Sequence, residues 1–529
     1  MSGNSGMVAQ LPDDLLWLVA DWLGAWRQLA AVSRALRERM APRACVLRAH
    51  DPPPACGVRD VLYLARIGED GPRAAAEGGS PTQPQQWSVR RLAVWLTQPP
   101  DAACGGGGAA LLPLCSHPLR GLWLSARLVS LQLRAPRVLV PSVHWVRLAD
   151  ALRALDALES LDLDLAGCRR SDHWVVATTR SLWNALPRHL ERVRLRLRDN
   201  HLGGDAARVL CRALAAAPRL RELDLDLSRN HGRLGILHAL HHHLLAPPPR
   251  TLRCLSLGLA GLRAVEQHDA ADLCTALLEP PSASSADRAV AAWDHLRVDL
   301  ADNHRAVVRR WLARLSQFTQ PPAWPRAALH LGLGGALAFG YDDPTTLLHG
   351  VSCLCHGLSR GGPPVVHLGL DGLCRLDLTD ALRPLVRAAP TSELSLALGP
   401  TLRPARYCAL LLLAAADGPP RCSRLSVDLR GSRLAPAALD SLARLCTHAA
   451  AGPCEIQLRG VPAAALLARV AARCTADSAP PGRRRRLGLW SSEDPDPSRD
   501  ILAAGWPSTA PAVVLHPIGD GPPSHPRPQ

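Results

Sequence analysis

Clusters of histidine and cysteine are the first places where this sequence gathers side chains that could do chemistry. Three histidines at 241–243 lie in the apolar run 237–245, and Cys353, Cys355 and His356 lie in another apolar run. Imidazole and thiolate are ligands that zinc prefers, but a zinc site usually takes two matched pairs of them. Neither cluster has an evident partner pair, so we expect no metal ion and no cofactor.

Patterns typical of catalysis are also missing from the sequence. The chain contains no lysine, so all 61 basic residues are arginine and no phosphate loop with its lysine can form. The glycine run 105–108 is interpreted as a linker, and no Ser/His/Asp arrangement stands out. We therefore expect a protein that is not an enzyme.

The net charge of +15 would ordinarily suggest a nucleic-acid partner. Arginine without any lysine, in a chain rich in Ala, Pro and Gly, instead indicates biased coding, so no nucleic acid is expected. The four arginines at 483–486 lie in a Pro-rich tail. They are either a solvated run or a nuclear-import patch.

The N-terminal residues 1–10 are polar and lack the apolar core of a signal peptide. The longest apolar stretch, 409–416, is far shorter than the roughly 20 residues that span a bilayer. Cysteines inside apolar helical runs behave as small buried hydrophobes; they are Cys211, Cys274, Cys408 and Cys446. We expect no membrane association, a reducing compartment, and a cytoplasmic and/or nuclear location.

A strand-like alternation of aliphatic residues recurs about every 30 residues, and the strands that it predicts would position the other side chains of each repeat. Its ten occurrences are 161/163/165, 193/195/197, 223/225/227, 255/257/259, 296/298/300, 329/331/333, 366/368/370, 394/396/398, 425/427/429 and a weaker 454/456/458. The first strand is open between 122–124 and 131–133. Between strands the spacing becomes helical, as in 207/210/211/214 and 439/442/443/446. Repeats of this length predict an array of strand–helix units.

The turns after three of these strands resemble leucine-rich repeats. Asn200, Asn230 and Asn303 each stand at the asparagine of the pattern LxLxxN. The repeat length is similar to that of the ribonuclease-inhibitor type. The resemblance implies an α/β solenoid with a curved parallel sheet inside, helices outside, and asparagines that satisfy backbone groups. Gly334, Asp371, Gly399 and Gly431 follow later strands, so we expect a broken asparagine ladder there.

Two or three short amphipathic helices are predicted near the N-terminus. The order LPDDLL from 11 to 16, followed by spaced aliphatic residues and VSRAL at 32–36, resembles an F-box. That resemblance implies a helical module that docks a Skp-type cullin adaptor. The residues that would bind the adaptor are Leu11, Pro12, Leu15, Leu16, Val19, Leu23 and Val32. The alternative is a plain helical cap, because repeat arrays must cover their terminal apolar edge.

Residues between the aliphatic positions of a strand point to the opposite, concave face. Charged rows on the first strands are expected to pair with one another, whereas the middle strands carry small residues and histidine. A protein partner is therefore expected on Ser256, Gly258, Arg297, Asp299, His330, Gly332, His367, Gly369 and Ser395. Bulky replacements at Gly332 and Gly369, but not charge reversal at Arg194 and Arg196, are expected to abolish binding.

These patterns predict five segments: a disordered tail (1–10), the F-box-like module (11–45), a Gly/Pro-rich linker with short helices (46–118), the repeat array (119–475) and a Pro-rich, largely disordered tail (476–529). The expected function is a non-catalytic scaffold, a substrate receptor of a cullin-RING (SCF-type) ubiquitin ligase whose repeats hold a protein target. The alternatives are a repeat protein without a ubiquitin role and, on repeat type alone, a regulator of small GTPases.

Overall fold

The computed structural model describes most of residues 129–476 and four strands outside them, at 45–49, 91–96, 486–491 and 512–517. The larger gaps are 135–148, 168–180, 231–234, 262–266, 279–292, 335–343, 400–403 and 409–421. The chain divides into two compact units, Met1–Leu252 and Arg253–Gln529. Each unit is described by itself.

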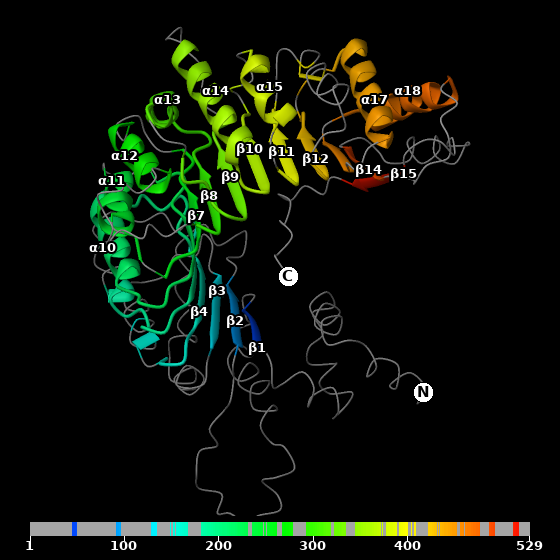
Figure 1. Ribbon diagram of the computed structural model, residues 1–529. Helices are drawn as coiled ribbons and strands as arrows, with labels where there is room; N and C mark the ends of the chain where they lie inside the picture. Colours follow the sequence, from blue (N-terminus) through cyan, green and yellow to red (C-terminus); the bar gives the residue numbers. More distant parts are fainter. Residues whose placement is uncertain are drawn as a thin grey trace, which may run out of the picture. The chain divides into compact units, whose positions relative to one another are not determined.

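The first unit is a sheet of parallel strands with helices on one face (Figure 1). Each strand pairs with the next one along the chain. The strands are β1 (Cys45–Ala49), β2 (Arg91–Leu96), β3 (Ser130–Arg134), β4 (Ser160–Asp164), β5 (Arg192–Arg196) and β6 (Glu222–Asp226). The helices are α10 (Gly204–Ala215), α11 (Ile236–Leu240) and the π-helical turn η2 (His241–Leu245).

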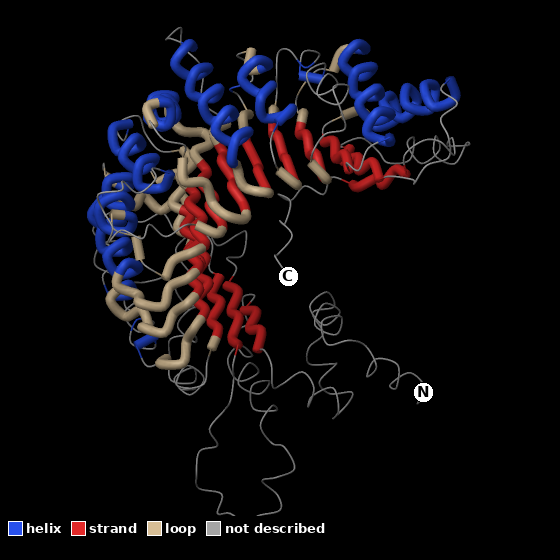
Figure 2. Tube along the Cα trace, viewed as in Figure 1, coloured by secondary structure: helices blue, strands red, loops and turns tan. Residues whose placement is uncertain are grey.

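The second unit repeats the same order of parallel strands and helices (Figure 2). Its strands are β7 (Cys254–Gly258), β8 (His295–Asp299), β9 (Ala328–Gly332), β10 (Val365–Gly369), β11 (Glu393–Ala397), β12 (Arg424–Asp428), β13 (Glu455–Arg459), β14 (Arg486–Ser491) and β15 (Ala512–Pro517). Its helices are α12 (Gln267–Leu278), α13 (Arg305–Ser316), α14 (Pro344–Gly361), α15 (Thr379–Ala388), α17 (Pro436–Ala451) and α18 (Ala463–Ala476).

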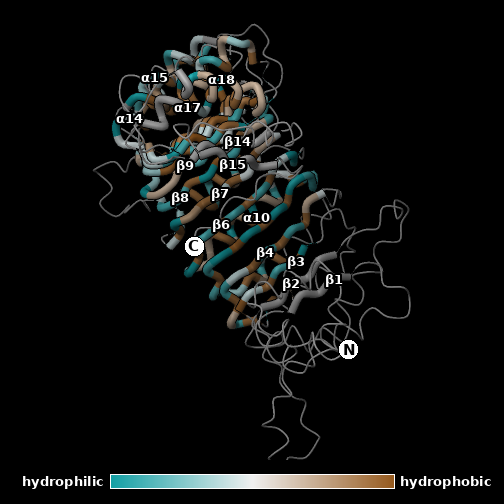
Figure 3. The backbone as a smooth tube through the Cα atoms, turned by 90° about the vertical axis from the view of Figure 1, so that its right-hand side faces the viewer, coloured by the Kyte–Doolittle hydropathy of each residue, from teal (hydrophilic) through white to brown (hydrophobic). Residues whose placement is uncertain are grey.

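Aliphatic rows form the core of both units, as the alternation along the strands predicts. Leu163, Leu195 and Leu225 are fully buried in the first unit, and Leu257 and Val298 in the second. The tube in Figure 3 alternates accordingly between hydrophobic and hydrophilic residues along the strands. Burying one leucine contributes about 1.5–3 kcal/mol, several times the worth of an exposed ion pair. The leucine rows, and not the charges, therefore hold each sheet to its helices.

The predicted helical stripes are also confirmed. On α10, Ala207, Leu210, Cys211 and Leu214 are all buried, because spacings of three and four residues bring them to one side of the helix. The corresponding stripe of α17 (Leu439, Leu442, Ala443 and Cys446) is buried in the same way.

The structure has strands beyond both predicted ends of the array. Apart from Cys45, β1 and β2 lie in the segment 46–118, for which a linker was expected. β14 and β15 lie in the tail that was expected to be largely disordered. The predicted array of 119–475 is therefore too short at both ends. Of the two candidate first strands, 131–133 lies in β3, whereas 122–124 is outside the described residues.

Two members of the tenth aliphatic triplet, Ile456 and Leu458, lie in the buried row as predicted. Leu425 of β12 pairs with Ile456 of β13, and Val427 pairs with Leu458, whereas Cys454 comes before β13 in the sequence, outside the described residues. The residues on the other face are Glu455, Gln457 and Arg459.

Asparagine turns connect successive repeats as the pattern predicted. The Nδ2 of Asn230 donates to Leu197 O at 2.9 Å and to Leu227 O at 2.8 Å. Its Oδ1 accepts from the N–H groups of Asn200 and Leu202 at 2.9 and 3.0 Å. Asn303 likewise donates from Nδ2 to the carbonyls of residues 259 and 300. One amide therefore satisfies four backbone groups that no strand ladder reaches.

Later turns replace asparagine in two ways. After β10 the equivalent position is Leu373, which is buried. After β12 it is Ser432, whose Oγ donates to Gly399 O at 2.6 Å. The expected break in the ladder is thus only partial, because a hydroxyl takes over one of the amide's hydrogen bonds.

Glycines pack closely around one of these later turns. A Cβ at Gly334 would lie 2.6 Å from the backbone nitrogen and oxygen of Asp371, and a Cβ at Gly399 would lie 2.9 Å from its Cβ. Gly399 also has a φ of 51°, which L side chains rarely adopt. These turns approach one another more closely than any residue with a Cβ allows.

Candidate functional site

The strand face that carries no helices, called the helix-free face below, presents every predicted partner-binding residue of the second unit. Their strand neighbours toward the helices are buried, whereas they are partly or fully exposed. Register aligns them in two rows that cross the strands. The first row is Ser256, Arg297, His330, His367 and Ser395; the second is Gly258, Asp299, Gly332, Gly369 and Ala397.

Two histidines stack at the middle of the first row. His330 and His367 are register partners on β9 and β10, and their ring centroids lie 4.1 Å apart with an angle of 13° between the planes. Neighbouring strands are about 4.8 Å apart, so two imidazoles in register meet face to face. The sequence placed both residues on this face but did not reveal the stack.

The second row is less open than its glycines suggested. A Cβ added at Gly332 would lie 2.5 Å from Asp299 Oδ1, so the Asp299 carboxylate already covers this glycine. The same Oδ1 accepts the N–H of Ala301 at 3.0 Å, which fixes the carboxylate at the strand end. At Gly369 the nearest atoms to an added Cβ are backbone atoms of residues 331 and 332. The strand backbone is therefore uncovered by side chains at Gly369 but not at Gly332.

Arg297 on β8 differs from Arg194 on β5 and Arg424 on β12. Its side chain is exposed, and the structure places no ion pair or hydrogen bond on it from the described residues. By contrast, Arg424 on β12 lies between Glu393 at 3.6 Å and Glu455 at 3.4 Å. A positive charge is consequently left available beside the stacked histidines.

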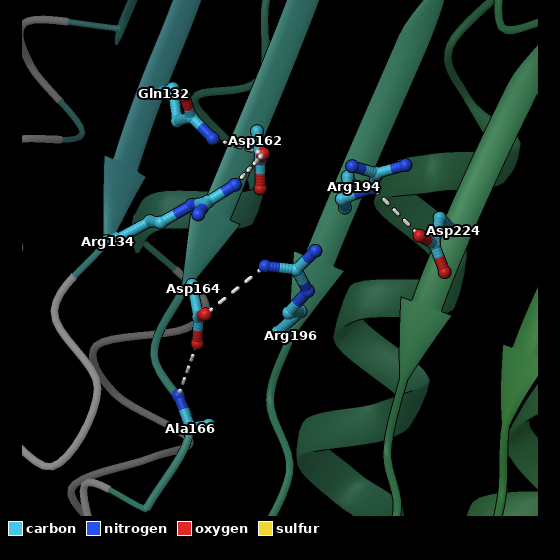
Figure 4. Close-up of polar contacts among 8 residues, drawn as sticks. All are labelled: Gln132, Arg134, Asp162, Asp164, Ala166, Arg194, Arg196 and Asp224. Carbon is cyan, nitrogen blue, oxygen red and sulfur yellow. Dashed lines mark hydrogen bonds and ion pairs between the residues drawn. The ribbon is translucent and has the colours of Figure 1, made fainter. Parts of the chain in front are cut away.

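The helix-free face of the first unit carries paired charges instead, as expected from the sequence (Figure 4). Arg194 Nε lies 2.8 Å from Asp224 Oδ2, and Arg196 Nη1 lies 3.3 Å from Asp164 Oδ2. Asp162 accepts from Gln132 Nε2 at 2.8 Å and also pairs with an arginine of β3. Each such pair is partly solvated and contributes under about 1 kcal/mol. These charges neutralise one another and leave little for a ligand.

The histidines at 241–243 gather with His238 on the helical side of the first unit. The ring of His242 lies 4.2 Å from that of His238 and 4.4 Å from that of His241. Burial, and then the positive charges of Arg212 and Arg208, lower the pKa of His243 below its ordinary 6.5. Two guanidiniums beside the cluster oppose a bound cation. Among the described residues no group of three or more His, Cys, Asp or Glu is placed to hold a metal ion.

The predicted buried cysteines lie in the core. Cys211, Cys274, Cys408 and Cys446 are buried and form no disulfide. Burial raises the pKa of Cys211 and Cys408 to about 12. Such thiols stay protonated near neutral pH and are poor nucleophiles.

The seven residues predicted to bind an adaptor (Leu11, Pro12, Leu15, Leu16, Val19, Leu23 and Val32) lie outside the described residues. The arginine run is described only at its last member, Arg486, where β14 begins. None of the described helices is long and apolar enough to cross a membrane. No protein-family model matches the chain, and no curated protein sequence matches it.

Proposed function

We propose that the chain is a non-catalytic leucine-rich-repeat solenoid that binds a protein target as the substrate receptor of an SCF-type ubiquitin ligase. The repeat assignment is supported by the asparagine turns, in which Asn200, Asn230 and Asn303 hydrogen-bond to the preceding coil. The ligase role is supported by the order LPDDLL at 11–16 with VSRAL at 32–36, which resembles an F-box.

A second candidate is a repeat protein without a ubiquitin role, in which residues 11–45 only cap the array. A specific observation favours it: β1 begins at Cys45 and pairs in parallel with β2. Among the described residues the sheet therefore starts where the F-box-like segment ends, which is the place of a terminal cap.

Capture of a Skp-type adaptor by the purified full-length chain separates the two. If the segment is an F-box, Leu15→Arg with Leu16→Arg abolishes capture, because two charges replace apolar contacts. The matched control is Leu62→Arg with Leu64→Arg, a double leucine change outside the motif, which should retain capture.

A pure cap gives a different result. The parent chain then captures no adaptor, while the change at 15 and 16 lowers the midpoint of thermal unfolding by exposing the edge of the array. Capture that survives the change at 15 and 16 would contradict the ligase role.

A further inference from the structure

The helix-free face of the second unit contains a row of polar side chains in which the exposed guanidinium of Arg297 has no ion pair or hydrogen bond from the described residues. We propose that Arg297, His330 and His367 bind an acidic segment of a protein target, an extended peptide that presents Asp or Glu carboxylates. This inference rests on the proposed role of the repeats as the target-binding part, and it names the chemistry of the target.

Charge complementarity is the first argument. Arg194 of the first unit, which stands at the equivalent position of its strand, already has a carboxylate, Asp224 at 2.8 Å. The exposed guanidinium of Arg297 has none among the described residues. A guanidinium forms two parallel hydrogen bonds to a carboxylate, which makes it a specific receptor for that group.

The surroundings of Arg297 limit competition from the protein's own acids. Asp299, on the same strand, has Oδ1 engaged by the N–H of Ala301 at 3.0 Å. On β11, Glu393 is 3.6 Å from Arg424. Asp299 Oδ1 and Glu393 therefore already have donors, whereas the guanidinium of Arg297 keeps its own donors for an incoming carboxylate.

The shape of the row is the second argument. From Arg297 to Ser395 it crosses four neighbouring strands, about 14 Å at the usual strand spacing. That distance is the length of four or five extended residues. Beside it, Gly369 offers only backbone next to an added Cβ, and Ala397 follows on β11. A peptide can thus lie close to the sheet while its carboxylates reach the polar row.

The stacked histidines should make this binding depend on pH. Each imidazole faces the other at 4.1 Å, so protonating both is opposed by like-charge repulsion. A bound carboxylate favours the protonated form. The other titratable or charged groups on the flanking strands are His295, Arg297 and Asp299 of β8 and Glu393 of β11.

The test measures binding of fluorescein-labelled (Glu-Gly)5 to the full-length chain by anisotropy, with (Gln-Gly)5 as the uncharged probe. Only the acidic peptide should bind, and Arg297→Gln should weaken it about tenfold or more, the usual worth of a charge-assisted hydrogen bond. The matched control Arg194→Gln removes an exposed but paired arginine and should change the affinity less than about twofold.

A second pair of measurements tests the histidines. Lowering the pH from about 7.5 to about 6 should tighten binding of the acidic peptide to the parent chain, because imidazole titrates in this range. His330→Asn with His367→Asn should abolish that gain and keep the binding due to Arg297.

Three results would overturn the proposal: no binding of the acidic peptide, equal binding of both peptides, or equal losses from the Arg297 and Arg194 changes. Adaptor capture is measured separately, so its failure refutes the ligase role without touching this result. Loss of peptide binding with intact capture refutes only the acidic-segment inference.

Discussion

The two units build the same repeat with different chemistry. In the first unit the helix-free face carries rows of opposite charge that pair across strands, and its turns are bridged by asparagine. In the second unit the middle strands β9 and β10 carry histidine and glycine on this face, and after the asparagine turn of Asn303 a late turn is held by Ser432 and close-packed glycines. The buried leucine rows are the same in both. The core thus specifies the fold, while the face and turns are free to diverge.

The largest contrast should appear at the turns. Asn230→Ala removes four buried hydrogen bonds, and each backbone group left unsatisfied costs about 1–3 kcal/mol. We expect a loss of at least about 3 kcal/mol in the free energy of unfolding, measured by urea denaturation. Ser432→Ala removes one hydrogen bond and should cost about 1 kcal/mol. Equal losses would show that the two turns are equivalent after all.

A smaller effect is expected from the glycine packing of the second unit. Gly399→Ala imposes a positive φ on a residue with a Cβ and brings that Cβ against Asp371; we expect a cost of about 1–3 kcal/mol. The control Gly361→Ala lies in α14 with nothing within 4 Å of the new methyl group. It should be neutral or stabilising by under about 1 kcal/mol. Thermal unfolding of the two variants decides whether close approach requires Gly399.

The smallest expected effect is a difference between the two units in how their stability depends on pH. In the folded first unit the pKa of His243 is lowered by burial and then by Arg212 and Arg208. The contribution of neutral His243 to the free energy of unfolding is therefore present above pH 6.5, its ordinary pKa, and is lost as the pH falls below that value. His243→Gln should reduce the stability lost between about pH 7 and pH 5. An unchanged loss would mean that His243 does not contribute to it.

The stability of the second unit should change with pH in the opposite direction. Burial, and then the charge of Asp428, raise the pKa of Asp371 above its ordinary 3.8, although Arg430 opposes this shift. The ionised carboxylate therefore costs stability as the pH rises through the folded pKa. Asp371→Asn should be more stable than the parent at pH 7, with the advantage lost below about pH 3.8. A variant less stable than the parent at pH 7 would contradict this sign.

Local patterns were enough to predict much of the fold. The leucine triplets, helical stripes and asparagine turns each depend on residues within a few positions of one another, so the sequence displays them directly. Leu92, Val94 and Leu96 of β2 have the same spacing and were a usable but overlooked signal.

The candidate site was predicted as a set of residues but not as an arrangement. Which strands are neighbours was readable, whereas the stack of His330 on His367 depends on register and side-chain torsions. The sequence also gave no sign that Asp299 covers Gly332, because two residues on different strands decide that space. The availability of Arg297 follows only from knowing which carboxylates are already engaged.

Within each unit every strand pairs with the next one in the chain. Contacts are therefore short in sequence, and little chain entropy has to be lost before they form. Each new strand and helix can add to a finished edge, so such an array can fold progressively while the chain is still being synthesised. A break in one repeat would then stop the growth of the array at that point and leave the earlier repeats intact.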